Sequence, residues 1–178
     1  MIPGLKVVAP STPRDVIGLM AAAVRDPDPV IFFEHKSLYA TKGEVPDGEI
    51  VDQLGSAKIV RPGKDATILA LALMVPRALA AAEKLKADHG IDCEVVDVRS
   101  LVPLDTQTIL GSVGRTHRLF TVEENPRLCG WGAELVSIVD KAMAREKCDR
   151  YATAMDLARD LGNFVEGRVV IAAGSAPA

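Results

Sequence analysis

The sequence predicts an α/β protein with a doubly wound, mostly parallel sheet. Three observations indicate this fold class: short aliphatic runs alternate with segments of helical periodicity, aromatic residues make up only 4% of the chain, and alanine is abundant between positions 66 and 82. Strands that alternate with helices form right-handed crossovers between parallel strands. The 178 residues, 48% of them hydrophobic, suffice for one domain, or for one domain and part of another.

The first predicted unit is a strand, a helix and a second strand. The run LKVVAP at residues 5–10 is the first strand. Thr12 is expected to cap the helix, with Pro13 at its first position and Asp15 in its first turn. The prolines at 27 and 29 end the helix, and the apolar run at 30–33 predicts a buried strand. The apolar positions of the helix are Val16, Leu19, Met20, Ala23 and Val24.

A second unit follows a polar segment rich in glycine and proline, residues 35–63, which predicts a surface linker with one short strand at 57–60. Residues 67–73 predict a strand, Gly90 ends the helix after it, and residues 91–96 predict the next strand. The buried face of that helix is expected at Val75, Ala78, Leu79, Ala82 and Leu85. The residues expected in the core of the sheet are Ile68, Leu69, Leu71, Val95, Leu119 and Val122.

The remaining elements complete the alternation. Asp105 or Thr106 caps a helix that carries Ile109, Leu110 and Val113, and residues 118–122 predict a strand. The apolar positions of a final helix are Leu135, Val136, Ile138, Val139 and Ala142. After position 148 the pattern weakens: residues 152–161 favour a helix, residues 168–172 favour a short strand, and the terminal GSAPA is disordered by composition.

Composition excludes several classes of function. A net charge of -3 without a dense basic run argues against nucleic acid as a partner. The longest apolar stretch, residues 68–75, is too short to span a bilayer, and the N-terminus lacks the order of a signal peptide. The wide spacing of Cys93, Cys129 and Cys148 favours neither a zinc site nor a disulfide framework. A reducing cytoplasm is therefore the expected location.

The stretch TVEENPRLCGWGAEL, residues 121–135, offers three readings. Gly130-Trp131-Gly132 lies between a predicted strand and a predicted helix, where a phosphate loop would lie, but it lacks the third glycine and the Gly-Lys-Ser/Thr ending of such loops. Cys129 near the helix start could be a reactive thiolate, yet nothing in the sequence places a histidine base beside it. We favour a packing role, in which the glycines allow close approach and Trp131 fills a pocket.

Other charged groups follow strands, where open α/β sheets carry their functional loops. Glu123 and Glu124 are adjacent on an extended segment, so their side chains point to opposite sides, and one of them could meet a partner. The triplet at residues 34–36, Glu-His-Lys, invites an active-site reading, although a solvated charged loop is the commoner outcome. His89, beside Gly90 at a helix end, is expected to be structural, and His117 to lie on the surface.

Four segments together resemble the beta subunit of thiamine-diphosphate-dependent 2-oxo acid dehydrogenase components, which act on pyruvate, branched-chain 2-oxo acids or acetoin. They are PGLKVVAPSTPRDVIGLMAAAVRDPDPVIFFEHKSLY, KGEVPDGE, VVDVRSLVPLDTQTIL and GRTHRLFTVEENPRLCGWGAEL, in family order over about residues 2–147. The wording EENPRLCGWGAE is most similar to the acetoin and branched-chain branches. The segment from 148 onward departs from the family pattern.

The resemblance implies a domain organisation. Residues 1–36 would be the end of a transketolase-like pyrimidine-binding domain, residues 37–56 a linker, residues 57–150 a transketolase C-terminal-like domain, and residues 151–178 a diverged, partly disordered tail. In this family the loop at Trp131 belongs to the domain that serves assembly. The resemblance thus implies Glu123, Glu124 and Trp131 as candidates for a partner interface.

The resemblance also implies a function. The full enzyme decarboxylates a 2-oxo acid oxidatively, or cleaves acetoin, and passes the acyl group to a lipoyl arm. This chain would supply structure and partner contacts, and no catalytic or cofactor-binding residue is assigned to it. Its expected partners are an alpha subunit, a lipoyl acyltransferase core and further copies of itself, with association through the apolar strand at 30–33 and the Trp131 loop. Neither a nucleic acid nor a membrane is expected as a partner.

The implied cofactors are thiamine diphosphate and magnesium in the full complex. Some family members also hold a monovalent cation through backbone carbonyls, and the matching positions here are Ala23, Asp26 and Asp28. The resemblance implies potassium as a candidate for this cation. Two alternatives stay open: the third domain of another thiamine enzyme, of the transketolase or deoxyxylulose-phosphate synthase type, and a stand-alone interaction module without catalysis.

The isolated 178-residue chain is expected to bind no thiamine diphosphate at useful affinity. The family's diphosphate-magnesium motif, Gly-Asp-Gly, does not occur in its sequence, and the resemblance places the activating glutamate outside the matching segments. Calorimetry with cofactor and magnesium measures this directly, and micromolar binding by the isolated chain would contradict the expectation.

Overall fold

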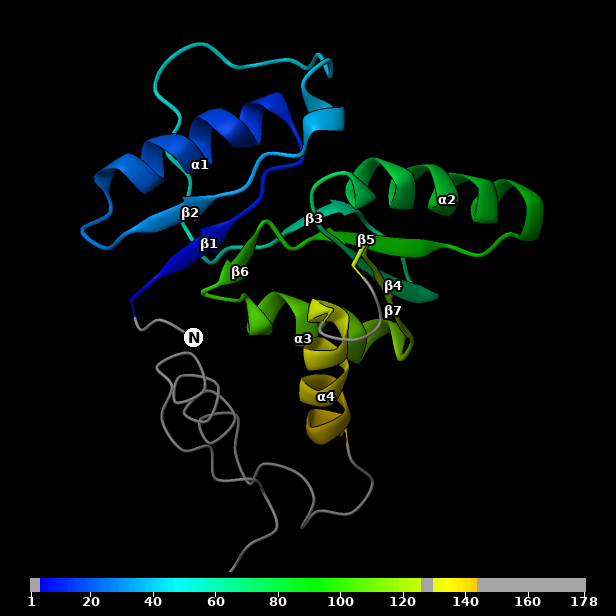
Figure 1. The fold of residues 1–178 in the computed structure, drawn as a ribbon. Helices are drawn as coiled ribbons and strands as arrows, with labels where there is room; N and C mark the ends of the chain where they lie inside the picture. The colour runs from blue at the N-terminus through cyan, green and yellow to red at the C-terminus, as the bar shows by residue number, and fades with distance from the viewer. Residues whose placement is uncertain (1–3, 126–129, 144–178) are drawn as a thin grey trace, which may run out of the picture. The chain divides into compact units, whose positions relative to one another are not determined.

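The computed structural model describes residues 4–125 and 130–143 (Figure 1). The chain divides into two compact units, one formed by Leu5–Glu124 and the other by Met1–Gly4 with Asn125–Ala178. Each unit is described by itself. The helix and strand expected at 152–161 and 168–172, the tail from 151 and Cys129 lie outside the described residues.

The larger unit begins as its sequence predicts. Strand β1 (Lys6–Val8), helix α1 (Pro13–Arg25) and strand β2 (Val30–Phe32) follow one another. The Thr12 side chain caps α1 by accepting a hydrogen bond from the Asp15 backbone N–H, and Pro13 is the first helical residue. β1 and β2 pair in parallel, with Val7 opposite Ile31. A short 3₁₀ helix, Lys36–Leu38, follows β2.

The second part of this unit contains β3 (Lys58–Arg61), β4 (Ala66–Ala70), α2 (Met74–His89) and β5 (Cys93–Asp97). Gly90 ends α2 in the left-handed conformation, at φ 69°, as the sequence predicts. β4 ends at Ala70, earlier than expected, because the Leu71 carbonyl already accepts a hydrogen bond from the Met74 N–H at 3.0 Å. The chain thus turns into α2 sooner than its apolar run suggests.

The unit closes with β6 (Ser100–Val102), α3 (Thr106–Thr116) and β7 (Leu119–Val122). Asp105 caps α3 by accepting from the Thr108 N–H at 2.9 Å. His117 follows α3 as its exposed C-cap, and His89 is exposed at the end of α2. β6 has no counterpart among the sequence predictions.

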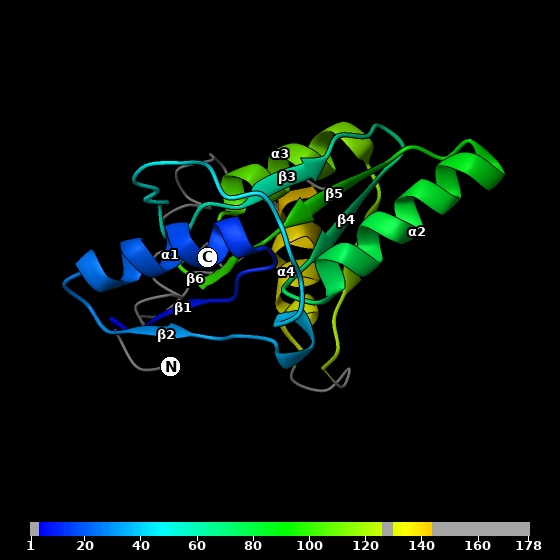
Figure 2. The same ribbon diagram turned by 90° about the horizontal axis from the view of Figure 1, so that it is seen from above.

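The strands form two sheets, in the orders β2-β1-β6 and β3-β5-β4-β7 (Figure 2). The pairs β1–β2, β4–β5 and β4–β7 are parallel, whereas β1–β6 and β3–β5 are antiparallel. The α/β class is therefore confirmed, and most of these pairs are parallel, as the sequence predicts. The sequence did not predict β6, which follows β5 in the chain but pairs with β1 in the three-stranded sheet.

Helices cover both faces of the four-stranded sheet (Figure 1). α2 packs on the face that carries Ile68 and Val95, with Ala78 and Ala82 as its small contact residues. On the other face, the Thr67 hydroxyl bonds to Ser112 and Thr116 of α3, each at 2.7 Å. Successive side chains of a β-strand point to opposite faces of the sheet. Neighbouring residues of β4 therefore contact different helices.

The predicted core is partly confirmed. Ile68, Leu69 and Val95 are buried, whereas Leu71, Leu119 and Val122 are half-buried. Leu71 lies beyond the end of β4, which explains why it is not enclosed.

The prediction of a buried strand at 30–33 is wrong. Among the described residues β2 pairs only with β1, so it is an edge strand, with Ile31 37% and Phe33 57% exposed. The predicted buried face of α1 is also partly wrong. Leu19 is fully buried, but Met20 and Val24 are exposed.

In the smaller unit the described helix is α4 (Trp131–Met143). Its residues Leu135, Ile138 and Val139 are buried, as the sequence predicts, whereas Val136 is exposed. None of the helices in residues 4–125 and 130–143 combines the length and apolar character that a membrane span needs.

Leu69→Asp should destabilise the protein severely. Leu69 is fully buried in β4, between β5 and β7, where an unpaired carboxylate costs several kcal/mol, on the order of the stability of a whole domain. Leu71→Asp is the matched control, since the half-buried Leu71 leaves the new charge access to water. Urea unfolding of both variants measures the difference. Equal losses at the two positions would show that β4 is placed incorrectly.

Candidate functional site

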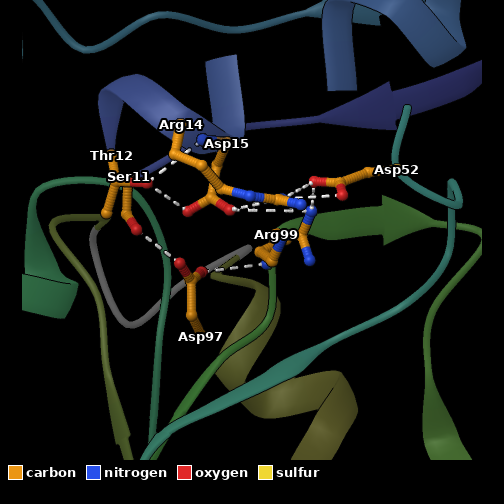
Figure 3. A network of polar contacts seen from close by, with 7 residues as sticks. All are labelled: Ser11, Thr12, Arg14, Asp15, Asp52, Asp97 and Arg99. Carbon is orange, nitrogen blue, oxygen red and sulfur yellow. Dashed lines mark hydrogen bonds and ion pairs between the residues drawn. The ribbon is translucent and has the colours of Figure 1, made fainter. Parts of the chain in front are cut away.

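A buried network of charged side chains forms where β1 and β5 end (Figure 3). Ser11 follows β1, and Asp97 is the last residue of β5. Arg99 lies two residues further, immediately before β6. Loops at the carboxyl ends of strands are where open α/β sheets hold their polar sites. The network is therefore the first candidate for a functional site in the larger unit.

Asp15 enters this network from the first turn of α1. Its Oδ2 accepts a hydrogen bond from the Thr12 hydroxyl at 2.6 Å, while its N–H donates to the same hydroxyl at 3.1 Å. The Asp15 Oδ1 lies 3.6 Å from Arg14 Nη1 and 3.7 Å from Arg99 Nη2. Among the described side chains, Asp15 Oδ1 and Arg99 Nε are buried without a hydrogen-bond partner. Both guanidinium groups nevertheless compensate the charge of this carboxylate.

Asp52 brings the linker into the network. Its carboxylate accepts hydrogen bonds from Arg14 Nη1 at 2.5 and 2.7 Å and from Arg99 Nη2. Burial raises the pKa of Asp52, but the Arg14 hydrogen bond and the Arg99 charge outweigh it, so the pKa lies below its ordinary value. Gly18 makes this approach possible, because a Cβ there would lie 2.6 Å from the carboxylate.

The pKa of Asp97 shifts in the opposite direction to that of Asp52. Burial raises its pKa to about 7, against hydrogen bonds donated by the Ser11 hydroxyl and by the Arg99 N–H, the latter at 3.1 Å. The negative charge of Asp15 raises the pKa further. Arg99 adopts φ 58°, a conformation that few non-glycine residues hold without tertiary support. Near neutral pH, Asp97 is thus only partly ionised.

A second polar cluster lies where β2 and β7 end. His35 Nε2 lies 2.9 Å from Glu124 Oε2, and its Nδ1 accepts a hydrogen bond from the Ser37 N–H at 3.2 Å. The Tyr39 hydroxyl donates to Glu34 at 3.1 Å. Because both imidazole nitrogens are engaged, His35 is held as a structural link and is not placed as a general base.

A cleft of about 370 Å³ opens beside this cluster. Its walls are apolar, with Pro13, Val16, Ile17 and Leu38, and its polar rim includes Glu34 and His35. A carboxylate at the rim, without a lysine or arginine among the residues that line the cleft, suits a cationic or apolar ligand better than a phosphate.

The residues that the resemblance implies for a cation lie together at the end of α1. The Ala23 carbonyl accepts from the Asp26 N–H at 3.4 Å. Lys6 Nζ lies 2.7 Å from Asp26 Oδ1 and 3.1 Å from Asp28 Oδ2, and its hydrogen bond lowers the pKa of Asp26. One ammonium group thus pairs with two carboxylates, and the three side chains together keep one negative charge. No cluster of three or more histidine, cysteine, aspartate or glutamate side chains suited to a metal occurs in the described part of the chain.

The other candidates belong to both units. Glu124 pairs with His35, Glu123 is half-buried, and Trp131 is the half-buried first residue of α4 in the smaller unit. Burial raises the pKa of the Cys93 thiol, so this cysteine is not an activated nucleophile.

Sequence reasoning missed Ser11 and four charged members of the buried network, namely Arg14, Asp52, Asp97 and Arg99. The one local signal was the pair Asp97 and Arg99 at the end of a buried strand, where a charged residue has no solvated face to occupy.

Comparison with known proteins gives two family matches. The family model of the transketolase C-terminal domain matches residues 55–157, and the model of the transketolase pyrimidine binding domain matches residues 1–42. The chain is similar to a solved structure described as a split gene transketolase, inactive beta4 tetramer, with a TM-score of 0.68 and 29% identity. The similarity covers 81% of this chain and 46% of that one.

Curated relatives are more similar in sequence. The beta subunit of acetoin:2,6-dichlorophenolindophenol oxidoreductase from Cupriavidus necator is 53% identical over 134 residues, 75% of this chain and 39% of the relative. The beta subunits of the pyruvate dehydrogenase E1 component from Rickettsia felis and Bacillus subtilis are 48% and 46% identical, over 79% of this chain and 43% and 44% of their own lengths. The chain therefore spans less than half the length of these relatives.

Asp97→Asn should change how stability depends on pH. An aspartate has a pKa of about 3.9 when unfolded, so a folded value of about 7 means that the parent loses roughly 4 kcal/mol of stability as pH rises from about 4 to about 7. The variant carries no ionisable group there, so its stability relative to the parent should rise over the same range. Urea unfolding at several pH values measures the difference.

Asp26→Asn is the control with the opposite sign. Its hydrogen bond from Lys6 lowers the Asp26 pKa, so the parent gains stability from this group at neutral pH and loses it as pH falls. The variant should be less stable than the parent at neutral pH and match it in acid. Parallel pH curves for the parent and Asp97→Asn would contradict the assignment of a raised pKa.

Proposed function

Because the chain belongs to the transketolase C-terminal domain family, we propose that it is the C-terminal part of a beta subunit in a 2-oxo acid dehydrogenase or acetoin-cleaving component. The observation that carries this proposal is the identity of 46–53% with acetoin and pyruvate dehydrogenase beta subunits over 75–79% of the chain. The complete enzyme decarboxylates a 2-oxo acid oxidatively, or cleaves acetoin, and transfers the acyl group to a lipoyl arm. It is an oxidoreductase.

Within that enzyme this chain contributes structure and partner contacts. The geometry of the larger unit supports this role, because the charges of its buried network neutralise one another and His35 has both nitrogens engaged. The isolated chain is thus proposed to be inactive.

The complete enzyme is proposed to use thiamine diphosphate with magnesium. The cleft beside His35 does not fit that cofactor, because Glu34 lies at its rim and the described residues that line it include no lysine or arginine to meet a diphosphate. We therefore assign the cofactor to other parts of the enzyme and no step of its chemistry to these residues. A potassium ion at the carbonyls of Ala23, Asp26 and Asp28 remains a proposal, in which Lys6 would compete for the adjacent carboxylates.

The proposed partners are an alpha subunit and the lipoyl acyltransferase core, with Glu123, Glu124 and Trp131 at the contacts. The relatives are named as beta subunits, and these names support an alpha subunit as a partner. Association with further copies of the chain is also proposed, and the solved relative described as a beta4 tetramer supports it. The cytoplasm is the proposed location. A transketolase or a stand-alone module is less favoured, since the transketolase structure is 29% identical and the beta subunits are 46–53% identical.

A chimera tests the proposal. The segment of the Cupriavidus necator beta subunit that matches this chain is replaced by the corresponding residues here, and the product is expressed with its alpha subunit. At 53% identity we expect a stable complex of both subunits with measurable acetoin-dependent activity. The same exchange in the Bacillus subtilis pyruvate dehydrogenase beta subunit is the matched comparison for substrate class. Folded chimeras that bind neither alpha subunit would contradict the proposal.

A further inference from the structure

The three-stranded and four-stranded sheets of the larger unit meet through polar groups. The main packing contacts between elements join β1, α1, β2 and β6 with one another, or the remaining elements with one another. The apolar cluster on the four-stranded sheet likewise draws its buried residues from β4, α2 and β5. We call the contacts between the two sheets the joint. A region that shares little apolar surface opens more easily than a core does.

The chain crosses the joint between β5 and β6 in two residues, Val98 and Arg99. The Asp97 carboxylate accepts hydrogen bonds from the Ser11 hydroxyl and, at 3.1 Å, from the Arg99 N–H (Figure 3). The Arg99 carbonyl accepts from the Ala9 N–H at 2.8 Å. Asp97 therefore ties both the crossing and the loop after β1 to the four-stranded sheet.

We propose that the joint opens locally while the four-stranded sheet stays folded, and that a proton on Asp97 keeps the joint closed. With the proton, the carboxyl is uncharged and can donate a hydrogen bond to the Ser11 oxygen. Without the proton, a full negative charge is enclosed at 0% exposure, close to the carboxylate of Asp15. Opening lets water reach this charge and relieves the cost of burying it.

The sign of the pH dependence follows from the two states of Asp97. Burial raises its pKa to about 7 in the closed joint, whereas a solvated aspartate has a pKa of about 3.9. Since the closed state binds the proton more tightly, opening becomes more frequent as pH rises from about 4 to about 7, and then levels off. Acid thus closes the joint. Asp15, Asp97 and Arg99 are at most 5% exposed, so this device lies inside the larger unit and on none of its surfaces.

Other charges surround Asp97. After burial, the negative charge of Asp15 raises its pKa, while the positive charge of Arg99 lowers it. On β4 the residue opposite Asp97 is the uncharged Ala70. The charged residues of the adjoining elements are Arg14 and Asp15 of α1, Asp52 of the linker, Lys58 opposite Asp97 on β3, Arg77 of α2, Arg99, and Arg115 of α3 with its partner Glu94. The parent, Asp97→Asn and Ser11→Ala share all of these charges, so differences among them report on Asp97.

The ion pair of His35 with Glu124 also crosses the joint, and it is the rival for control by pH. His35 Nδ1 accepts a hydrogen bond from the Ser37 N–H, which places the proton of a neutral imidazole on Nε2. There it donates to Glu124 without a further proton. We therefore expect His35→Gln to keep the pH dependence of the parent.

Amide hydrogen exchange, followed by NMR between about pH 5 and about pH 8, tests the proposal. The Ala9 N–H crosses the joint, whereas the Thr67 N–H donates to the Arg118 carbonyl at 2.8 Å within the four-stranded sheet. After division by the intrinsic exchange rate, the opening constant at Ala9 should exceed that at Thr67 at least about 100-fold. It should rise roughly 50-fold from about pH 5 to about pH 7.

Three variants locate the group that titrates. Asp97→Asn should hold the Ala9 opening constant at the parent's acid value at every pH. Ser11→Ala removes a hydrogen bond that lowers the Asp97 pKa, so the rise should level off at higher pH. Glu94→Gln is the matched control, because Glu94 is also a buried carboxylate of β5 but pairs with Arg115 of α3, away from the joint. It should leave the Ala9 profile unchanged.

The opposite results overturn the proposal in distinguishable ways. Equal opening constants at Ala9 and Thr67 would show that the joint opens only when the whole unit unfolds. An Ala9 opening constant that does not change with pH, or that changes equally in Asp97→Asn, would remove Asp97 from the device. If His35→Gln abolishes the rise instead, the pair with Glu124 is the switch. None of these results affects the chimera, which reports on the alpha subunit.

Discussion

The buried ion pairs between α1, the linker and the segment after β5 determine how the larger unit is built. Arg14 and Arg99 compensate the carboxylates of Asp15 and Asp52, which come from separate parts of the chain. Removing one partner of such a group leaves an uncompensated buried charge, at a cost of about 3–5 kcal/mol. The segments that carry these residues must therefore stay together. The pairing of β6 with β1 adds a backbone connection at the same place.

The network holds the strand ends through contacts on more than one side of each residue. The Arg99 carbonyl accepts from the Ala9 N–H at 2.8 Å, and its N–H donates to Asp97, so both sides of the left-handed residue are held. Asp97 takes no guanidinium as a hydrogen-bond partner, and burial raises its pKa to about 7. Catalysis needs groups with free access to a substrate. These side chains have partners inside the protein instead.

Features set by neighbouring residues could be predicted from the sequence. The N-cap at Thr12 and the left-handed Gly90 depend on contacts within a few positions, as does the spacing that defines α2. The network could not be predicted, because Asp52 and Arg99 are 47 positions apart and nothing local shows that both are buried. The same holds for β6, whose partner β1 lies far away in sequence.

Helix α1 shows why hydrophobic periodicity alone was insufficient. Its sequence is apolar on both sides, with Leu19 on one and Ile17 and Val24 on the other, so either side could face the sheet. The charges decide the rotation. Asp15 must reach the arginines, and Gly18 must face Asp52, since a larger residue would collide with that carboxylate. Once these contacts form, Leu19 is turned inward, and Ile17 and Val24 are left exposed. The buried polar network thus determines which apolar side chains of α1 face the interior of the unit.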